Sequence, residues 1–247
     1  MIERTERDGI SILRLAHGKA SAFDLELLEE LQRHLESEMS GAIVLTGTGS
    51  IFSAGVDLFR LTREGRPYVE KFVPALVSML EAIFTMNTPV VSAVNGHAIA
   101  GGFILNAAAD YRIMAAGNGR IGIPELLVGV PFPALALEIV RFATAQQHIE
   151  EFVYTGKTVL PDEALAKGIV DEVVEPAAML DRAIAVARQL AAIPRQAFRI
   201  AKQQLRRPYV DRARSLAAAD RDALEVWADP GTHEHIRAYL ETLGLRR

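Results

Sequence analysis

Apolar residues recur along the chain with two different periods, which predict strands and helices that interleave. Residues 24–38 indicate an amphipathic helix, because four leucines share one face and Asp24 can cap its start. Asp8-Gly9 separates two alternating segments and predicts a tight hairpin turn. The full pattern predicts strands at 2–6, 10–15, 42–46, 90–94, 110–115 and 169–174, and helices at 24–38, 57–61, 101–109, 177–192, 194–205, 209–227 and 232–243. It also predicts a longer helix ending near 87 and mainly helix between the strands 110–115 and 169–174.

Strands and helices alternate as far as residue 192, and only helices are expected beyond it. This order predicts an α/β core followed by a helical C-terminal extension. We therefore expect a core over 1–192 and a helical region over 193–247. A chain of 247 residues is long enough to bury a core without disulfides or metals.

The composition narrows the possible chemistry. Half of the residues are hydrophobic and 23% are charged, which excludes a disordered or fibrous chain. The absence of cysteine excludes a thiol nucleophile, a disulfide framework, an iron–sulfur cluster and a cysteine zinc site. A net charge of -4 argues against a nucleic-acid partner. We expect no membrane span and a cytoplasmic protein, because the longest apolar stretch, 98–109, is short and the first residues do not form a signal peptide.

Two glycine-containing segments of small residues, 52–58 and 95–102, adjoin predicted buried strands. Neither has the G-x-G-x-x-G or G-K-[ST] spacing of nucleotide-binding loops. Each alone is explained by a tight turn where two chain segments pass closely. Together they predict an oxyanion hole, in which the backbone N–H groups of Ala54 and Gly101 donate to one carbonyl oxygen, the second from a helix N-terminus.

Five segments, in this order along nearly the whole chain, carry a family resemblance: FSAGVDL, NGHAIAGG, ADYRIM, IGIPELLVGV and TGKTVLPDEALAKGIVDEVV. They resemble the crotonase superfamily, the enoyl-CoA hydratase/isomerase family. The resemblance implies an α/β fold, a crotonase-like spiral of ββα units with a helical C-terminal extension. It also implies oxyanion donors at Ala54 and Gly101, and a homotrimer or hexamer that assembles through the C-terminal region. An acyl-CoA thioester is the implied substrate, so that coenzyme A is part of the substrate and no separate cofactor or metal is expected.

Two carboxylate positions distinguish the reactions of this family. Its hydratases use one glutamate three residues after the oxyanion glycine and another in a G-x-P-E type segment; here these positions hold Ile104 and Glu125. Adding water needs two groups, one to deprotonate the water and one to protonate carbon, whereas one carboxylate can move a proton between two carbons. Family isomerases also carry an aliphatic residue at the Ile104 position. We therefore expect an isomerase that converts 3-enoyl-CoA into 2-enoyl-CoA, with Glu125 as proton shuttle.

Other functions stay open on the sequence alone. An enoyl-CoA hydratase, or another crotonase reaction such as thioester hydrolysis, fits the same oxyanion hole. A non-catalytic acyl-CoA-binding protein fits the missing first glutamate, although retention of Glu125 favours an enzyme. An acid that follows Pro124 also suits the first turn of a helix without any catalytic role.

The resemblance further implies a substrate-binding surface. Lys19 lies in a segment expected to hold the adenine and phosphates of coenzyme A, where a cation is favourable, although a solvated lysine explains it equally. The implied surface consists of Lys19, Ala20, Ala22, Ala54, Gly55, Val56, Asp57, Leu58, Gly101, Ile104 and Phe132.

Some remaining polar residues have simpler explanations. Asp57 is expected to cap a helix, and His97 to pack or hydrogen-bond near the site. Ser53 has no histidine partner suggested by the sequence, which argues against a serine hydrolase. The histidines of His233-Glu234-His235 are two residues apart, so they point in different directions and indicate a solvated helix start. Four arginines can serve a coenzyme A phosphate, a subunit contact or the solvent: Arg206, Arg207, Arg212 and Arg214.

Overall fold

The larger of two sheets has six strands. The computed structural model describes residues 1–245, apart from the side chain of residue 217. The strand order is β1-β2-β3-β5-β7-β10, in which β1 pairs antiparallel with β2 and every other neighbouring pair is parallel. The strands are β1 (Ile2–Arg7), β2 (Ile10–Leu15), β3 (Ala42–Thr46), β5 (Val90–Val94), β7 (Tyr111–Ala115) and β10 (Glu172–Val174).

A second, smaller sheet has the strand order β4-β6-β8-β9. β4, β6 and β8 run parallel, and β9 is antiparallel to β8. Gly96 allows the chain to pass closely here, because a Cβ at this position would lie 1.8 Å from the Ser50 carbonyl oxygen. The strands are β4 (Ile51–Ser53), β6 (His97–Ile99), β8 (Ile121–Gly122) and β9 (Thr158–Val159).

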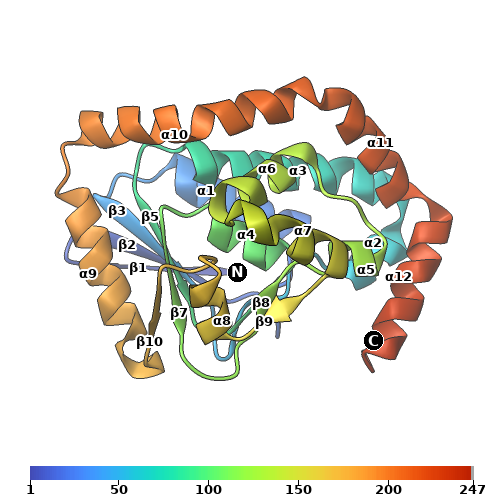
Figure 1. The fold of residues 1–247 in the computed structure, drawn as a ribbon, viewed down its shortest axis with the longest axis horizontal. Coiled ribbons are helices and arrows are strands. Elements are labelled where there is room, and N and C mark those ends of the chain that lie inside the picture. The colour runs from blue at the N-terminus through green and yellow to red at the C-terminus, as the bar shows by residue number, and fades with distance from the viewer. Residues whose placement is uncertain (246–247) are drawn as a thin grey trace.

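Helices cover both faces of the larger sheet, and the C-terminal ones arch over the molecule. In Figure 1, α10 runs along the top, and α11 and α12 continue down the right-hand side to the C-terminus. The helices are α1 (Leu25–Glu36), α2 (Leu58–Glu64), α3 (Arg66–Thr85), α4 (Gly101–Ala107), α5 (Glu125–Val128), α6 (Ala134–Ala143), α7 (Gln146–Thr155), α8 (Pro161–Ala166), α9 (Met179–Ala191), α10 (Arg195–Ser215), α11 (Ala217–Ala228) and α12 (Pro230–Thr242), with a 3-10 turn at Pro176–Ala178.

The apolar strands of the larger sheet are buried on both faces. Ile43 and Leu45 of β3 join the main core, which includes α1, α3 and α6. Ala42 and Val44, the alternate residues of the same strand, join a second core beneath α9. Side chains alternate across a strand, so two covered faces require an uninterrupted apolar run. This explains why the central strand β3 is apolar from Ala42 to Leu45.

The expected α/β core with C-terminal helices is confirmed, but one predicted break is wrong. A break was expected between helices at 194–205 and 209–227, whereas α10 continues through Pro208 as far as Ser215. A proline inside a helix costs about 3 kcal/mol. Here the ring is exposed, while Arg206 and Val210 on either side of it are buried against the body of the protein. Tertiary packing therefore keeps the helix continuous.

Candidate active site

Three chain segments meet at one edge of the smaller sheet. The carboxyl ends of parallel strands lie at the same edge, and here the strands are β4, β6 and β8. Residues 54–56 follow β4, residues 100–101 follow β6, and Glu125 lies three residues after the end of β8. The Ala100 N–H also donates to the Gly122 carbonyl at 2.8 Å, which ties the second segment to the third. The fold thus brings the candidate oxyanion loops and the candidate acid to one place.

The two glycine-containing loops are in contact. A Cβ on Gly55 would lie 2.9 Å from the backbone nitrogen of Gly101 and 2.8 Å from the Ile99 carbonyl oxygen. Gly55 also has φ +77, a conformation that side-chain-bearing residues rarely adopt. Gly101 is the first residue of α4, so its N–H has no acceptor within the helix. This amide is therefore available to a ligand at the junction of the two loops.

The expected second donor, Ala54, is already engaged. Its N–H donates to the Ala20 carbonyl at 3.0 Å, so in this structure it is not available to a ligand. Phe23 pairs with the chain on either side of Val56, through the Gly55 carbonyl at 2.7 Å and the Asp57 N–H at 2.9 Å. In a parallel pairing of this kind, the N–H of the central residue points away from the partner strand. Within residues 1–245 no acceptor pairs with the Val56 N–H, and it replaces Ala54 as the free amide of this loop.

Ser53 and Asp57 hold this loop in shape. The buried Ser53 hydroxyl donates to the Ser21 carbonyl at 2.8 Å and accepts from the Gly55 N–H at 3.1 Å. This hydroxyl is a structural link, in keeping with the argument against a serine nucleophile. Asp57 caps α2 by accepting from the Arg60 N–H at 3.0 Å, which confirms its expected role as a helix cap.

Glu125 is a buried carboxyl group. It is 6% exposed, and its Oε2 is inaccessible and has no hydrogen-bond partner in the described part of the chain. Burial disfavours the charged form and raises the pKa of Glu125 to about 8, against a smaller lowering effect of its own backbone N–H. A carboxyl group with this pKa can take up and release a proton near neutral pH.

The helix that starts at Gly101 presents an apolar residue one turn later. Ile104 is 3% exposed, so the position that would carry a second carboxylate is buried and apolar. Ala100, just before the helix, has φ +54 and ψ -122, which costs about 1–3 kcal/mol for a residue with a side chain. Strain of this kind is frequent at functional sites, where it fixes a backbone amide in a required direction.

The residues expected to hold coenzyme A lie beside residues 54–58, which we call the Val56 loop. Lys19 is exposed, Ala22 is half-buried, and Ala20 reaches the loop through the hydrogen bond to Ala54. Leu58 and Phe132 are half-buried and pack against the main core. The segment 19–22 and the loop 54–58 therefore form one continuous surface next to the free amides.

The histidines considered in the sequence analysis form hydrogen bonds within the protein and are not grouped around a metal site. The His97 Nδ1 accepts from the Arg120 N–H at 3.2 Å, a hydrogen-bonding role as expected. His233 is buried and its Nε2 donates to the Trp227 carbonyl at 2.8 Å, so the expected solvated helix start is wrong at this residue. Sequence spacing missed this contact because α12 packs its first turn against α11. Across the described residues, no three histidine, aspartate or glutamate side chains are grouped to hold a metal ion.

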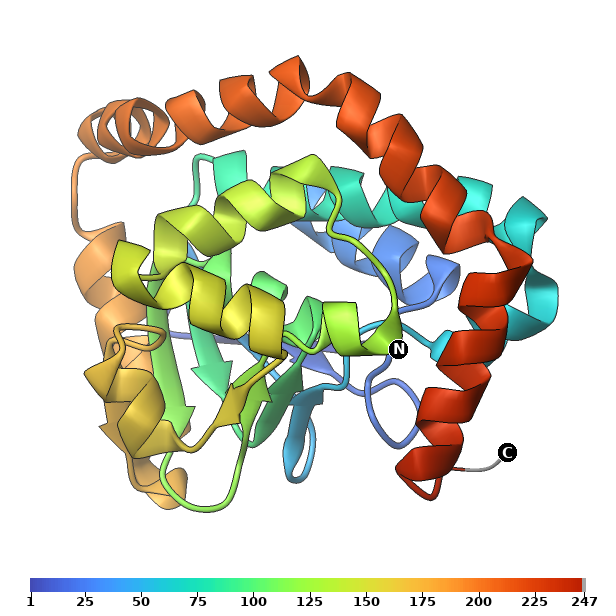
Figure 2. The same ribbon diagram turned by 45° about the vertical axis from the view of Figure 1, so that its right-hand side comes forward.

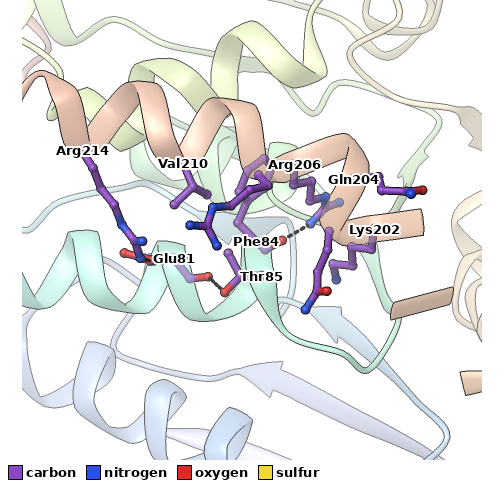
Figure 3. Close-up of a pocket in the computed structure, with 10 residues that line it drawn as sticks. Glu81, Phe84, Thr85, Lys202, Gln204, Arg206, Val210 and Arg214 are labelled. Carbon is purple, nitrogen blue, oxygen red and sulfur yellow. Dashed lines mark hydrogen bonds and ion pairs between the residues drawn. The ribbon is translucent and has the colours of Figure 1, made fainter. Parts of the chain in front are cut away.

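A hollow of about 460 Å³ lies elsewhere, between α3 and α10, and Figure 3 shows its lining. Glu125 does not line it. The buried Arg206 donates to the carbonyls of Phe84, Ala108 and Ala109 and pairs with Asp110 at 2.8 Å, while Lys202 pairs with the same carboxylate at 2.7 Å. The other three arginines that were candidates for a coenzyme A phosphate also form intramolecular ion pairs: Arg207 with Asp211, Arg212 with Glu138 and Arg214 with Glu81.

Comparison with known proteins identifies the class to which this fold and site belong. Mouse mitochondrial enoyl-CoA delta isomerase 1 is 28% identical over 217 residues, covering 85% of this chain and 75% of the mouse protein. A probable enoyl-CoA hydratase of Mycobacterium avium is 33% identical over 201 residues, covering 78% of this chain and 77% of that protein. The crystal structure of human mitochondrial delta3-delta2-enoyl-CoA isomerase matches with a TM-score of 0.92 at 25% identity, over 98% of both chains.

These matches define an α/β enzyme of the crotonase type. The enoyl-CoA hydratase/isomerase family profile matches residues 5–245. The chain therefore belongs to the enoyl-CoA hydratase/isomerase family. Within the described residues, no helix combines the length and apolar character needed to cross a membrane.

Proposed function

We propose that this protein is an acyl-CoA isomerase that moves a double bond from position 3 to position 2 of an enoyl-CoA thioester. The observation that carries the proposal is a site with one buried carboxyl group, Glu125, and isoleucine at the second carboxylate position. The similarity to the mouse and human isomerases supports it.

In this mechanism the backbone N–H groups of Val56 and Gly101 bind the thioester oxygen. Ionised Glu125 removes a proton from C2, and the charge of the resulting enolate is stabilised by the two amides. Protonated Glu125 then returns the proton to C4, so that the double bond moves and the enzyme is regenerated. A single carboxylate completes the cycle, because the proton lost at C2 equals the proton gained at C4.

The same geometry argues against efficient hydration. Water that attacks C3 needs a group to orient and deprotonate it, and an apolar side chain offers no hydrogen bond. Ile104 occupies the position of such a group. The similarity to the Mycobacterium avium hydratase keeps hydration as the alternative outcome of the assay.

For substrate binding we propose the surface formed by segments 19–22 and 54–58. The exposed Lys19 amine is available to the phosphates of coenzyme A. Gly55, Val56 and Asp57 shape the loop at the thioester, and Leu58, Ile104 and Phe132 supply apolar surface to the acyl chain. The further members of this surface are Ala20, Ala22, Ala54 and Gly101.

The test is a direct assay with an engineered second carboxylate. Wild type should convert 3-enoyl-CoA into 2-enoyl-CoA with little hydration. Ile104→Glu should add measurable hydration of 2-enoyl-CoA, at a stability cost of about 1–3 kcal/mol for burying a polar group. Ile104→Gln is the matched control, since it has the same shape without the acid and should not hydrate. Efficient hydration of 2-enoyl-CoA by wild type would refute the single-carboxylate mechanism.

We also propose that residues 193–247, of which 246–247 lie outside the described part, form the subunit contacts of a homotrimer or hexamer in the cytoplasm. Two large apolar side chains on α10 support this assembly, because Ile200 is 42% exposed and Leu205 is 63% exposed. Light scattering at micromolar protein should give a trimeric or hexameric mass, and a monomeric mass would contradict the proposal. Cell fractionation tests the location.

A further inference from the structure

The segment that carries Glu125 has little structure of its own. α5 is a single turn, and Gly129 ends it with φ +92. The following stretch as far as α6 contains Pro131 and Pro133, which have no N–H to donate. The position of Glu125 therefore depends on what holds the segment 125–134 from outside.

Three side chains of the C-terminal helices hold this segment by its backbone. Asp220 accepts from the Ala134 N–H at 2.6 Å. The Trp227 indole N–H donates to the Pro131 carbonyl at 2.8 Å. His235 donates through Nε2 to the Leu127 carbonyl at 3.0 Å. These contacts are spaced along the segment, so the C-terminal helices fix it at three points.

The side chains that contact this segment are themselves held in place by the C-terminal helices. Trp227 is 3% exposed, and its own carbonyl accepts from the buried His233. His235 also covers the end of α5, because a Cβ on Gly129 would lie 2.8 Å from its imidazole ring. α12 packs against both α5, which begins with Glu125, and α2, which begins at the end of the Val56 loop (Figures 1 and 2). The tail thus contacts both halves of the site.

We propose that Asp220, Trp227 and His235 are positioning residues, which keep Glu125 aimed at the oxyanion loops and shielded from water. This proposal rests on the proposed role of Glu125 as proton shuttle. A misplacement of about 1 Å lowers turnover as much as 10²-fold, so backbone contacts distant from the chemistry have a large effect.

The test removes two of the three contacts with small changes of shape. Trp227→Phe keeps an aromatic ring but removes the donor to Pro131, and His235→Leu removes the donor to Leu127. In the double variant, kcat for 3-enoyl-CoA should fall at least about tenfold. Carbon-13 NMR of glutamate-labelled protein without substrate, with the Glu125 signal assigned by its loss in Glu125→Gln, should show its titration midpoint moving down from about 8 as water enters.

Two matched variants separate positioning from general stability. Glu225→Gln removes one charge of an α11–α3 ion pair with Arg66 and leaves all three contacts to the segment, so kcat and the Glu125 midpoint should stay unchanged. His235→Gln keeps a side-chain N–H donor and should recover activity that His235→Leu loses. If the double variant does not fold, His235→Leu decides alone, because its side chain is exposed and no core residue is removed.

The outcomes separate this proposal from the proposed function. A folded variant without the contacts, whose Glu125 midpoint equals that of wild type, overturns the positioning role, whatever its turnover. A shifted midpoint in a protein whose wild type has no isomerase activity supports positioning and refutes the proposed reaction. A shifted midpoint together with reduced kcat supports both.

Discussion

Replacing Glu125 by glutamine is expected to lower isomerase turnover by about 10²–10⁴-fold, the contribution of a positioned general base. The amide has nearly the same shape as the carboxyl group but cannot accept a proton from C2 and return it to C4. Steady-state kinetics with 3-enoyl-CoA measures the loss, and circular dichroism checks that the variant is folded. Full activity of a folded Glu125→Gln protein would exclude Glu125 as the shuttle.

The raised pKa of Glu125 should make both the activity and the stability of the protein depend on pH. A base with a pKa of about 8 must be ionised to act, so kcat/KM of wild type should rise as pH increases through about 8.

The folded-state pKa of Glu125 lies above the ordinary value of 4.5, so the folded protein retains this proton more tightly than the unfolded chain. Relative to Glu125→Gln, wild type should lose stability as pH rises from about 4.5 to about 8. Urea unfolding of both proteins at several pH values measures this difference, and parallel pH profiles would contradict it.

The larger sheet was predictable because its strands are short, apolar and bounded by turns. The strands Ala42–Thr46 and Val90–Val94 have the expected limits, since both faces are buried and the apolar run ends where burial ends. The smaller sheet was not predicted. Its strands have only two or three residues in glycine-containing sequence, so no hydrophobic period can develop. These strands exist because the segments pair with one another across the fold.

The sequence predicted the two loops of the site, but it did not predict which backbone N–H of the first loop is free to donate to a ligand. Segments 52–58 and 95–102 indicated an oxyanion hole, and the fold brings them into contact at Gly55 and Gly101. Which of two nearby amides is free depends on the Ala20 carbonyl, which occupies the Ala54 N–H from a distant part of the sequence. The contacts of the C-terminal helices to segment 125–134 had no local signal either, because each joins residues about a hundred positions apart.

Gly101→Val should lower kcat/KM by about 10²–10³-fold, comparable to the loss of one oxyanion donor. A Cβ on Gly101 would lie 3.0 Å from two ring atoms of Phe23, and the branched valine side chain adds more bulk there. Phe23 is 1% exposed and belongs to the main core, so its ring can move only if its buried neighbours move as well. Its backbone also holds the residues on both sides of Val56, so a displaced Phe23 moves the Val56 amide as well. One substitution therefore disturbs both donors.

Ala100→Gly is the control at the neighbouring position. It adds no bulk and adopts the positive φ of Ala100 without strain, so the protein should fold and lose far less turnover than Gly101→Val. This result would show that the start of α4 tolerates a substitution, and that the loss in Gly101→Val comes from the crowded contact with Phe23. Kinetics with 3-enoyl-CoA and thermal unfolding of both variants make the comparison. A folded Gly101→Val enzyme with nearly wild-type kcat/KM would show that the thioester oxygen is not bound at Val56 and Gly101.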